Sequence, residues 1–205
     1  EIMRDYNLER DYDAYAEALL DWAMFLDNTG NDGSAMKTYR RALVLLQVVR
    51  GQDDEVIDNT LSRIANVLGR QGRAGEALQL LEQVKKRRIA VVGENHPLVA
   101  DVYFSLSQVC EKKRDYQAAT AALESCLRIR RATLGPFTEE VGMVISQIGI
   151  VEAHQAEFGK AICTWDEALA IYKKAGLFQD DVAVLDIMEH QANARRMLES
   201  LEEEQ

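Results

Sequence analysis

Apolar residues recur at helical spacing in two short runs within residues 102–129, VYFSLSQVCEKKRDYQAATAALESCLRI. In the first run, Leu106, Val109 and Cys110 are three or four residues apart, which places them on one face of a helix. Arg114 and Asp115 interrupt this pattern before a second run begins. The pattern predicts an αα-hairpin, two amphipathic helices joined by a tight turn. The apolar face of such a hairpin needs neighbouring hairpins to cover it.

The hairpin is one of four copies that repeat every 42 residues. Four alanines mark the period: Ala35, Ala77, Ala119 and Ala161. With these alanines as position 20, the units are 16–57, 58–99, 100–141 and 142–183. Position 8 is small each time (Ala23, Ala65, Ser107, Gly149), as is position 27 (Ala42, Val84, Cys126, Ala168). Large residues fill position 24 (Tyr39, Leu81, Leu123, Trp165) and position 7 (Trp22, Ile64, Leu106, Ile148). Interlocking helices require such alternation, so all four positions are expected to pack.

Glycines and capping residues predict where the helices begin and end. The glycines are Gly51, Gly93, Gly135 and Gly176, and a glycine in the left-handed conformation stops a helix. Asp54, Thr138 and Asp180 are the expected N-caps, and Pro97 suits a first helical position. The first helix of each pair is expected at 13–29, 55–71, 97–113 and 139–155. The second is expected at 33–50, 75–92, 117–134 and 159–175, and a further helix at about 180–200.

These elements predict an all-α fold, a right-handed superhelix (α-solenoid) of four helix-turn-helix repeats over residues 13–183. Residues 184–205 are expected to form a C-terminal capping helix and an acidic tail. Residues 1–12 are expected to be an N-terminal arm or the end of a helix from a missing repeat. Because the chain begins at Glu1 rather than Met, it is interpreted as a fragment or a processed chain.

Charge and cysteine content restrict the expected partners and compartment. A net charge of −10 disfavours binding of nucleic acid or an anionic membrane surface over the whole molecule. No run of about 18 apolar residues is present, so we expect no membrane insertion. Cys110, Cys126 and Cys163 have the spacing of neither a disulfide framework nor a metal site. We therefore expect a cytoplasmic or other reducing intracellular location, with import into an organelle left open.

The positions of small and large residues resemble those of tetratricopeptide repeats. Within that superfamily, the 42-residue unit and the linker at residues 92–100, VGENHPLVA, resemble the kinesin light chain type. The chain departs from kinesin light chains where that family carries paired asparagines lining its cargo groove. The equivalent pairs here are Leu20-Asp21, Ser62-Arg63, Phe104-Ser105 and Ser146-Gln147. A cargo adaptor of that type is therefore kept only as a second alternative.

The resemblance implies that the first helix of each pair lines a concave groove suited to an extended or helical peptide. Arg63, Arg70 and Lys112 predict a local positive zone, and the amides of Asn66 and Gln108 predict hydrogen bonds to a ligand backbone. Phe104, Met143 and Ile150 are the candidates for contact with an apolar side chain. These eight residues predict a site for a protein or peptide partner with an acidic segment.

No nucleophile elbow, phosphate-binding loop or zinc motif occurs in the sequence, so no enzyme activity, cofactor or metal is predicted. The predicted function is a non-enzymatic scaffold or adaptor that binds a partner segment in the groove. The alternative is a structural or assembly subunit of a large multiprotein complex, held by its convex face and edges. The third possibility is an enzyme, or the regulatory domain of an enzyme. The sequence shows no catalytic constellation that supports it.

Overall fold

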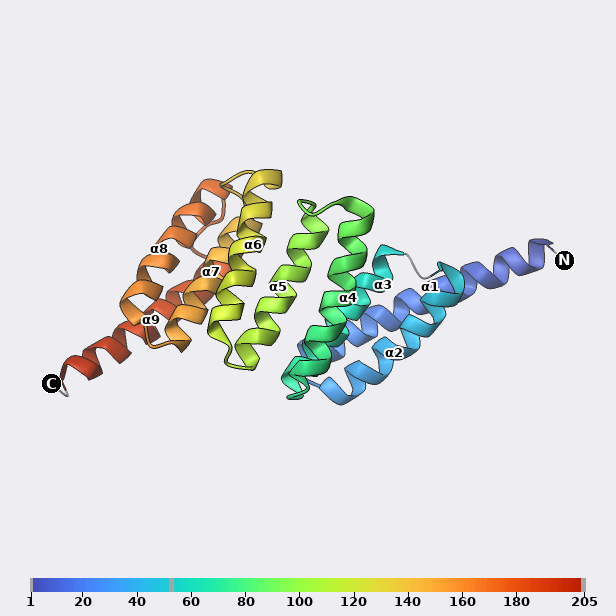
Figure 1. Ribbon diagram of the computed structural model, residues 1–205, viewed down its shortest axis with the longest axis horizontal. Helices are drawn as coiled ribbons and strands as arrows, with labels where there is room; N and C mark the ends of the chain where they lie inside the picture. Colours follow the sequence, from blue (N-terminus) through green and yellow to red (C-terminus); the bar gives the residue numbers. More distant parts are fainter. Residues whose placement is uncertain (1, 52–53, 204–205) are drawn as a thin grey trace. The chain divides into compact units, whose positions relative to one another are not determined.

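The computed structural model describes residues 2–51 and 54–203, with side chains for residues 11–51 and 54–201. Every regular element in these residues is an α-helix (Figure 1). The helices are α1 (Ile2–Asn28), α2 (Asp32–Val49), α3 (Glu55–Arg70), α4 (Ala74–Val92), α5 (Pro97–Lys112), α6 (Tyr116–Leu134), α7 (Glu139–His154), α8 (Phe158–Ala175) and α9 (Val182–Glu203). None of them has an apolar stretch long enough to cross a membrane.

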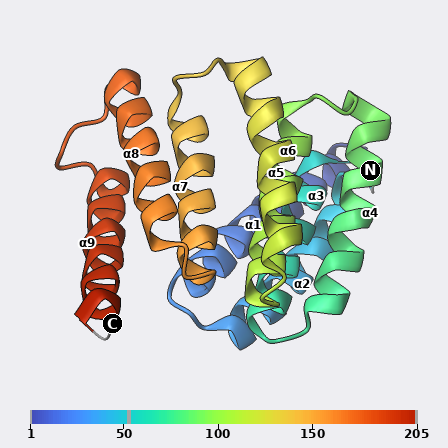
Figure 2. The same cartoon turned by 60° about the vertical axis from the view of Figure 1, so that its left-hand side comes forward.

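The described residues form two compact units, one up to Lys86 and one from Arg87 onward. In the first unit α1 packs against α2, and α2 packs against α3. In the second unit α5 packs on α6, α6 on α7, α7 on α8, and α8 on α9. Figure 2 shows α7, α8 and α9 beside one another. Each unit is therefore built from helices that contact their neighbours in chain order.

The 42-residue register is reproduced in the packing. The small residues at positions 8, 20 and 27 are buried in all four pairs, and so are the large residues at position 24. At Gly149, an added Cβ would lie 2.5 Å from Nε1 of Trp165, so the two helices of that pair approach closely. At position 7, Ile64 and Leu106 are buried and Ile148 is half-buried, whereas 54% of the surface of Trp22 is exposed. The expectation that Trp22 packs like its equivalents is wrong.

The helix boundaries agree with the predicted ranges to within two residues, apart from the start of α1 and the end of α9, which lies at Glu203 rather than near residue 200. Asp54 accepts a hydrogen bond from the Val56 N–H at 2.8 Å, as its predicted capping role requires. Thr138 precedes α7 but makes no side-chain capping bond. Asp180 is not the N-cap of the last helix, because α9 begins at Val182 and the carbonyl of Asp181 accepts its first backbone bonds.

Helix α1 begins at Ile2 and continues without a break to Asn28. Residues 2–12 are therefore the first turns of this helix, neither an arm nor a helix separated from it by a turn. The sequence contains no glycine or proline between Ile2 and Asn28, so nothing in this stretch stops helix propagation. The predicted start at residue 13 followed the repeat register instead.

Two buried arginines join consecutive pairs in the second unit. Arg88 and Arg130 occupy the same register position, 42 residues apart. Arg88 Nη1 donates to the carbonyl of Leu98 at 2.5 Å, and Arg130 Nη1 donates to the carbonyl of Glu140 at 3.0 Å. Each acceptor lies in the first turn of the next helix, so each arginine fixes that helix against the end of the preceding one.

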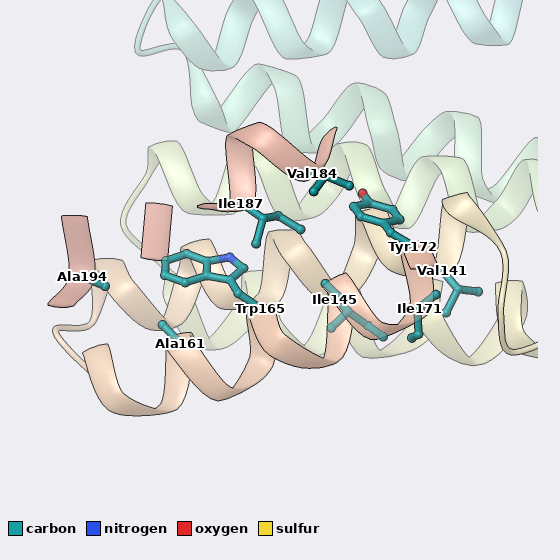
Figure 3. Close-up of a cluster of buried hydrophobic side chains, with 10 residues drawn as sticks. Val141, Ile145, Ala161, Trp165, Ile171, Tyr172, Val184, Ile187 and Ala194 are labelled. Atoms are coloured by element: carbon teal, nitrogen blue, oxygen red, sulfur yellow. The ribbon is translucent and has the colours of Figure 1, made fainter. Parts of the chain in front are cut away.

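Helix α9 closes the apolar surface of the last pair (Figure 3). Its residues Val184 and Ile187 are buried in one cluster with Trp165 and Tyr172 of α8. Figure 3 shows Trp165 beside Ile187, and Tyr172 beside Val184. Burial of these side chains removes the exposed face that α8 would otherwise present.

Candidate functional site

Arg70 of α3 is held between two carboxylates of the first unit. Its Nε and Nη2 donate to Oδ1 of Asp32 at 3.0 and 2.8 Å, and Nη2 also donates to Asp27. Hydrogen bonding to Asp32 and then to Asp27 raises the pKa of Arg70. The charge of Arg70 is balanced inside the fold, so the positive zone on α3 is smaller than the sequence indicates.

Tyr39 connects this ion pair to Arg63. The buried Tyr39 hydroxyl donates to Oδ2 of Asp27 at 3.1 Å. Burial, with a further contribution from Asp27, raises the pKa of Tyr39 to about 12, and the neighbouring Arg63 opposes this rise. The side chain of Arg63 is exposed, whereas Asn66, one helical turn further on, is half-buried.

The other predicted residues lie on α5 and α7 in the second unit. Phe104 is half-buried, and Cζ of Arg130 lies 5.5 Å from the centre of its ring. Gln108 is half-buried and Lys112 is exposed, with its Nζ 3.9 Å from Oε1 of Glu111. On α7, Met143 is exposed, and Ile150 is partly buried against the apolar cluster of α7, α8 and α9.

A buried carboxylate joins the inner faces of α5 and α7. Glu111 accepts a hydrogen bond from Nε2 of Gln147 at 2.6 Å, and Nδ1 of His154 lies 3.5 Å from its Oε1. All three residues lie on first helices, which the resemblance places along the groove, but none of them is among the eight predicted site residues. An acid at position 12 opposite an amide at position 6 of the next unit was the signal that could have identified this contact.

The predicted site residues are divided between the two units. Arg63, Asn66 and Arg70 belong to the first unit, and the candidates on α5 and α7 belong to the second. Within the second unit, the contact of Glu111 with Gln147 makes the inner faces of α5 and α7 one surface. That the two sets of residues line a single groove stays a prediction.

Two of the three cysteines have the surroundings of structural residues. Cys110 and Cys126 are buried, and burial raises the pKa of the Cys126 thiol to about 11. A thiol with a raised pKa is a poor nucleophile at neutral pH. Cys163 is exposed. In the part of the chain that the structure describes, no three His, Cys, Asp or Glu side chains gather closely enough to hold a metal ion.

Helix pairs stacked in a constant register define a helical-repeat protein. The tetratricopeptide repeat family model matches residues 56–132, so this part of the chain consists of tetratricopeptide repeats, as predicted. A TPR repeat-containing protein of Dictyostelium discoideum is 26% identical over 140 residues, which are 67% of this chain and 8% of that protein. The chain thus spans less than a tenth of the length of this relative.

Solved structures share the fold. BtubC (BKLC) from P. vanneervenii has a TM-score of 0.72 and 20% identity, over 93% of this chain and 76% of that one. A putative kinesin light chain of Podosopora anserina with nearly identical TPR-like repeats has a TM-score of 0.68 and 16% identity, over 93% and 90% of the two chains. PlcR of Bacillus thuringiensis, solved with the peptide PapR7 and DNA, has a TM-score of 0.53 and 11% identity, over 95% and 75%. These likenesses confirm the all-helical repeat fold, a fold that generally mediates protein–protein interaction.

Proposed function

We propose that this chain is a non-enzymatic binding module that holds a segment of a partner protein on the inner faces of its first helices. The observation that carries the proposal is the contact between Glu111 and Gln147, which joins α5 and α7 into one surface. This surface offers the exposed cation of Lys112 and the exposed thioether of Met143. Preformed helices lose little conformational entropy when a segment binds to them, which favours affinity.

The partner segment is proposed to be acidic with an apolar anchor. Lys112 supplies the positive charge for an acidic side chain. Its Nζ lies 3.9 Å from Oε1 of Glu111, and an ion pair of this length on an exposed side chain is weak. Met143 is a flexible apolar side chain that adapts to differently shaped partners.

Selection of random peptides displayed on phage against the whole chain tests this proposal. We expect acidic peptides containing one large apolar residue, with dissociation constants of about 10 μM. Lys112→Glu should weaken their binding about tenfold. Lys113→Glu is the matched control, because Lys113 is also exposed but points about 100° away around the helix axis. Peptides without acidic bias, or equal binding to both variants, would contradict the proposal.

The alternative function is a subunit of a larger protein complex, held by surfaces other than the inner face. The exposed aromatic residues of α1 favour it, since large apolar patches on a surface commonly mark protein interfaces. A cargo adaptor of the kinesin light chain type has less support, because the paired asparagines of that family are absent from this chain. We also propose a reducing compartment, which the free thiols of Cys110 and Cys126 support.

A further inference from the structure

One face of α1 exposes aromatic side chains that no other helix of the first unit covers, within the described residues. We define this aromatic face as Tyr15, Ala18, Trp22 and Phe25. Trp22 and Phe25 are 54% and 55% exposed, and their rings stack with centres 5.2 Å apart. Spacings of three and four residues align the four side chains along one side of the helix.

In the other three pairs, the equivalent positions belong to the core. The positions that correspond to Tyr15, Ala18 and Phe25 are buried in every copy: Ile57, Thr60 and Val67 on α3, Val99, Val102 and Val109 on α5, and Val141, Val144 and Val151 on α7. Helix α2 packs over α3, and α6 packs over α7. The aromatic face therefore has the position of a helix–helix interface whose second helix is not among the described residues.

The composition of this face favours a helix from a different molecule. Its equivalents are mostly β-branched aliphatic residues, which suit a permanent core. Aromatic residues are instead enriched where separate proteins meet, and Trp and Tyr supply much of the binding energy there. Valines on α2 extend the apolar surface, since Val44 and Val48 are also exposed.

The charges beside the aromatic face differ between its two edges. On the edge toward α2, Arg41 Nη2 lies 3.1 Å from the hydroxyl of Tyr15, and Arg40 lines the same shallow depression with Tyr15 and Val44. On the edge away from α2, α1 carries the exposed residue Asp21. A complementary helix would carry acidic residues along one edge and basic residues along the other.

We propose that the aromatic face of α1 binds an amphipathic helix of a partner protein, in the place that the second helix of a preceding pair would take. The helix presents an aliphatic stripe to Trp22 and Phe25, an acidic edge to Arg40 and Arg41, and a basic edge to Asp21. Of its residues only Asp21 is at a groove-lining position, so the contacts of Trp22, Phe25, Arg40 and Arg41 stand if the groove proposal fails.

A synthetic helix tests the proposal with the full chain. The probe is a peptide of about 20 residues with leucines at helical spacing, glutamates along one edge and lysines along the other. Trp22 reports docking, because it is exposed while the second tryptophan, Trp165, is buried. We expect a blue shift of tryptophan emission that saturates, with a dissociation constant of about 100 μM.

Two pairs of variants and one control peptide decide the outcome. Phe25→Ala should weaken binding about tenfold, whereas Phe137→Ala, which removes an equally exposed ring elsewhere, should leave it unchanged. A peptide of the same composition with scrambled leucines should not bind. Replacing Arg40 and Arg41 by glutamate should weaken binding of the probe about threefold to tenfold, and Lys112→Glu should have no effect.

Three results would overturn the proposal. The first is no saturable binding of the probe at about 1 mM. The second is equal binding of the scrambled peptide or of the Phe25→Ala variant. The third is a dimer of the wild-type chain in sedimentation equilibrium that Phe25→Ala dissociates, which would make a second copy the occupant of the aromatic face.

Discussion

Gly149 lies at a close approach of α7 to α8. An added Cβ would meet the indole of Trp165, whose Nε1 also donates to the carbonyl of Ser146 at 3.0 Å. Because this bond and the surrounding cluster hold the indole in place, the ring has little freedom to move away. The absence of a side chain at this residue is therefore a packing requirement.

We predict that Gly149→Ala lowers the free energy of unfolding by about 1–3 kcal/mol through overpacking. Gly159→Ala is the control, since Gly159 lies in α8 and an added Cβ there meets no atom within 4 Å. Alanine at that position should instead raise the free energy of unfolding, by up to about 1 kcal/mol, through helix propensity. Urea unfolding followed by circular dichroism compares the two variants, and similar effects would contradict the packing argument.

Two buried tyrosines predict a loss of stability at high pH. Burial raises the pKa of Tyr39 and of Tyr172 to about 12, from an ordinary value of 10.0. An acid whose pKa is higher in the folded state contributes stability that is present below its unfolded pKa and is lost above it. The free energy of unfolding should therefore fall as the pH rises from about 10 to about 12.

Ultraviolet absorbance of tyrosinate checks this expectation. The chain has seven tyrosines, and we expect Tyr39 and Tyr172 to ionise later than the exposed ones. Tyr172→Phe should remove part of the late transition and leave the early one unchanged. A wild-type titration in which all tyrosines ionise together near pH 10 in the folded protein would refute the assignment.

At the residue scale, the sequence predicted burial better than it predicted charge and exposure. Ala119 and Trp165 were placed correctly because the register fixes which side of a helix faces its neighbour. The sequence did not predict that carboxylates balance the charge of Arg70, since its partners Asp27 and Asp32 are far from it in sequence. The exposure of Trp22 was missed because the repeat register predicts which way a side chain points. It does not predict whether another helix covers that side.

At the scale of elements, Arg70 links three helices of the first unit. The guanidinium belongs to the last residue of α3, Asp27 to the end of α1, and Asp32 to the first residue of α2. One side chain of α3 thereby stabilises the turn between α1 and α2. This link is more constrained than an ordinary surface pair, because Asp27 also accepts a hydrogen bond from Tyr39.

A double-mutant cycle measures this link. We predict a coupling of about 1 kcal/mol between Arg70→Ala and Asp32→Ala, the upper end for partly exposed pairs. The cycle of Arg73→Ala with Glu76→Ala is the comparison, because that pair joins two exposed side chains three residues apart. It should give a clearly smaller coupling, because solvent screens a pair of exposed charges. If the two couplings are equal, Arg70 has no special role between the helices.

Helix ends were predictable because the signals for them are local. Gly51 has a positive φ of 81° and follows α2, as its expected stop function requires. Asp54 caps α3 through its own side chain. The N-terminal extension of α1 could not be derived from the repeat, because the other first helices have no counterpart of residues 2–12.

At the scale of the whole molecule, repeats that contact only their neighbours should respond locally to damage. Helix α7 contacts α6, α8 and α9. We predict that Gly149→Ala speeds amide hydrogen exchange in α7, α8 and α9 and leaves α1, α2 and α3 unchanged. Mass spectrometry of peptides from both units measures this. Faster exchange throughout the chain would mean that the two units unfold as one.

The buried arginines between pairs have a consequence for recombining these repeats. Arg88 and Arg130 each reach a carbonyl ten residues further along the chain, across the segment that connects one pair to the next. A residue inserted or deleted in that segment would displace the acceptor and leave a buried cation without it, a costly arrangement. The turns inside the pairs, such as residues 113–115, carry no such constraint from these arginines. Chimeric arrays should therefore be joined inside a pair, with each connecting segment kept at its natural length.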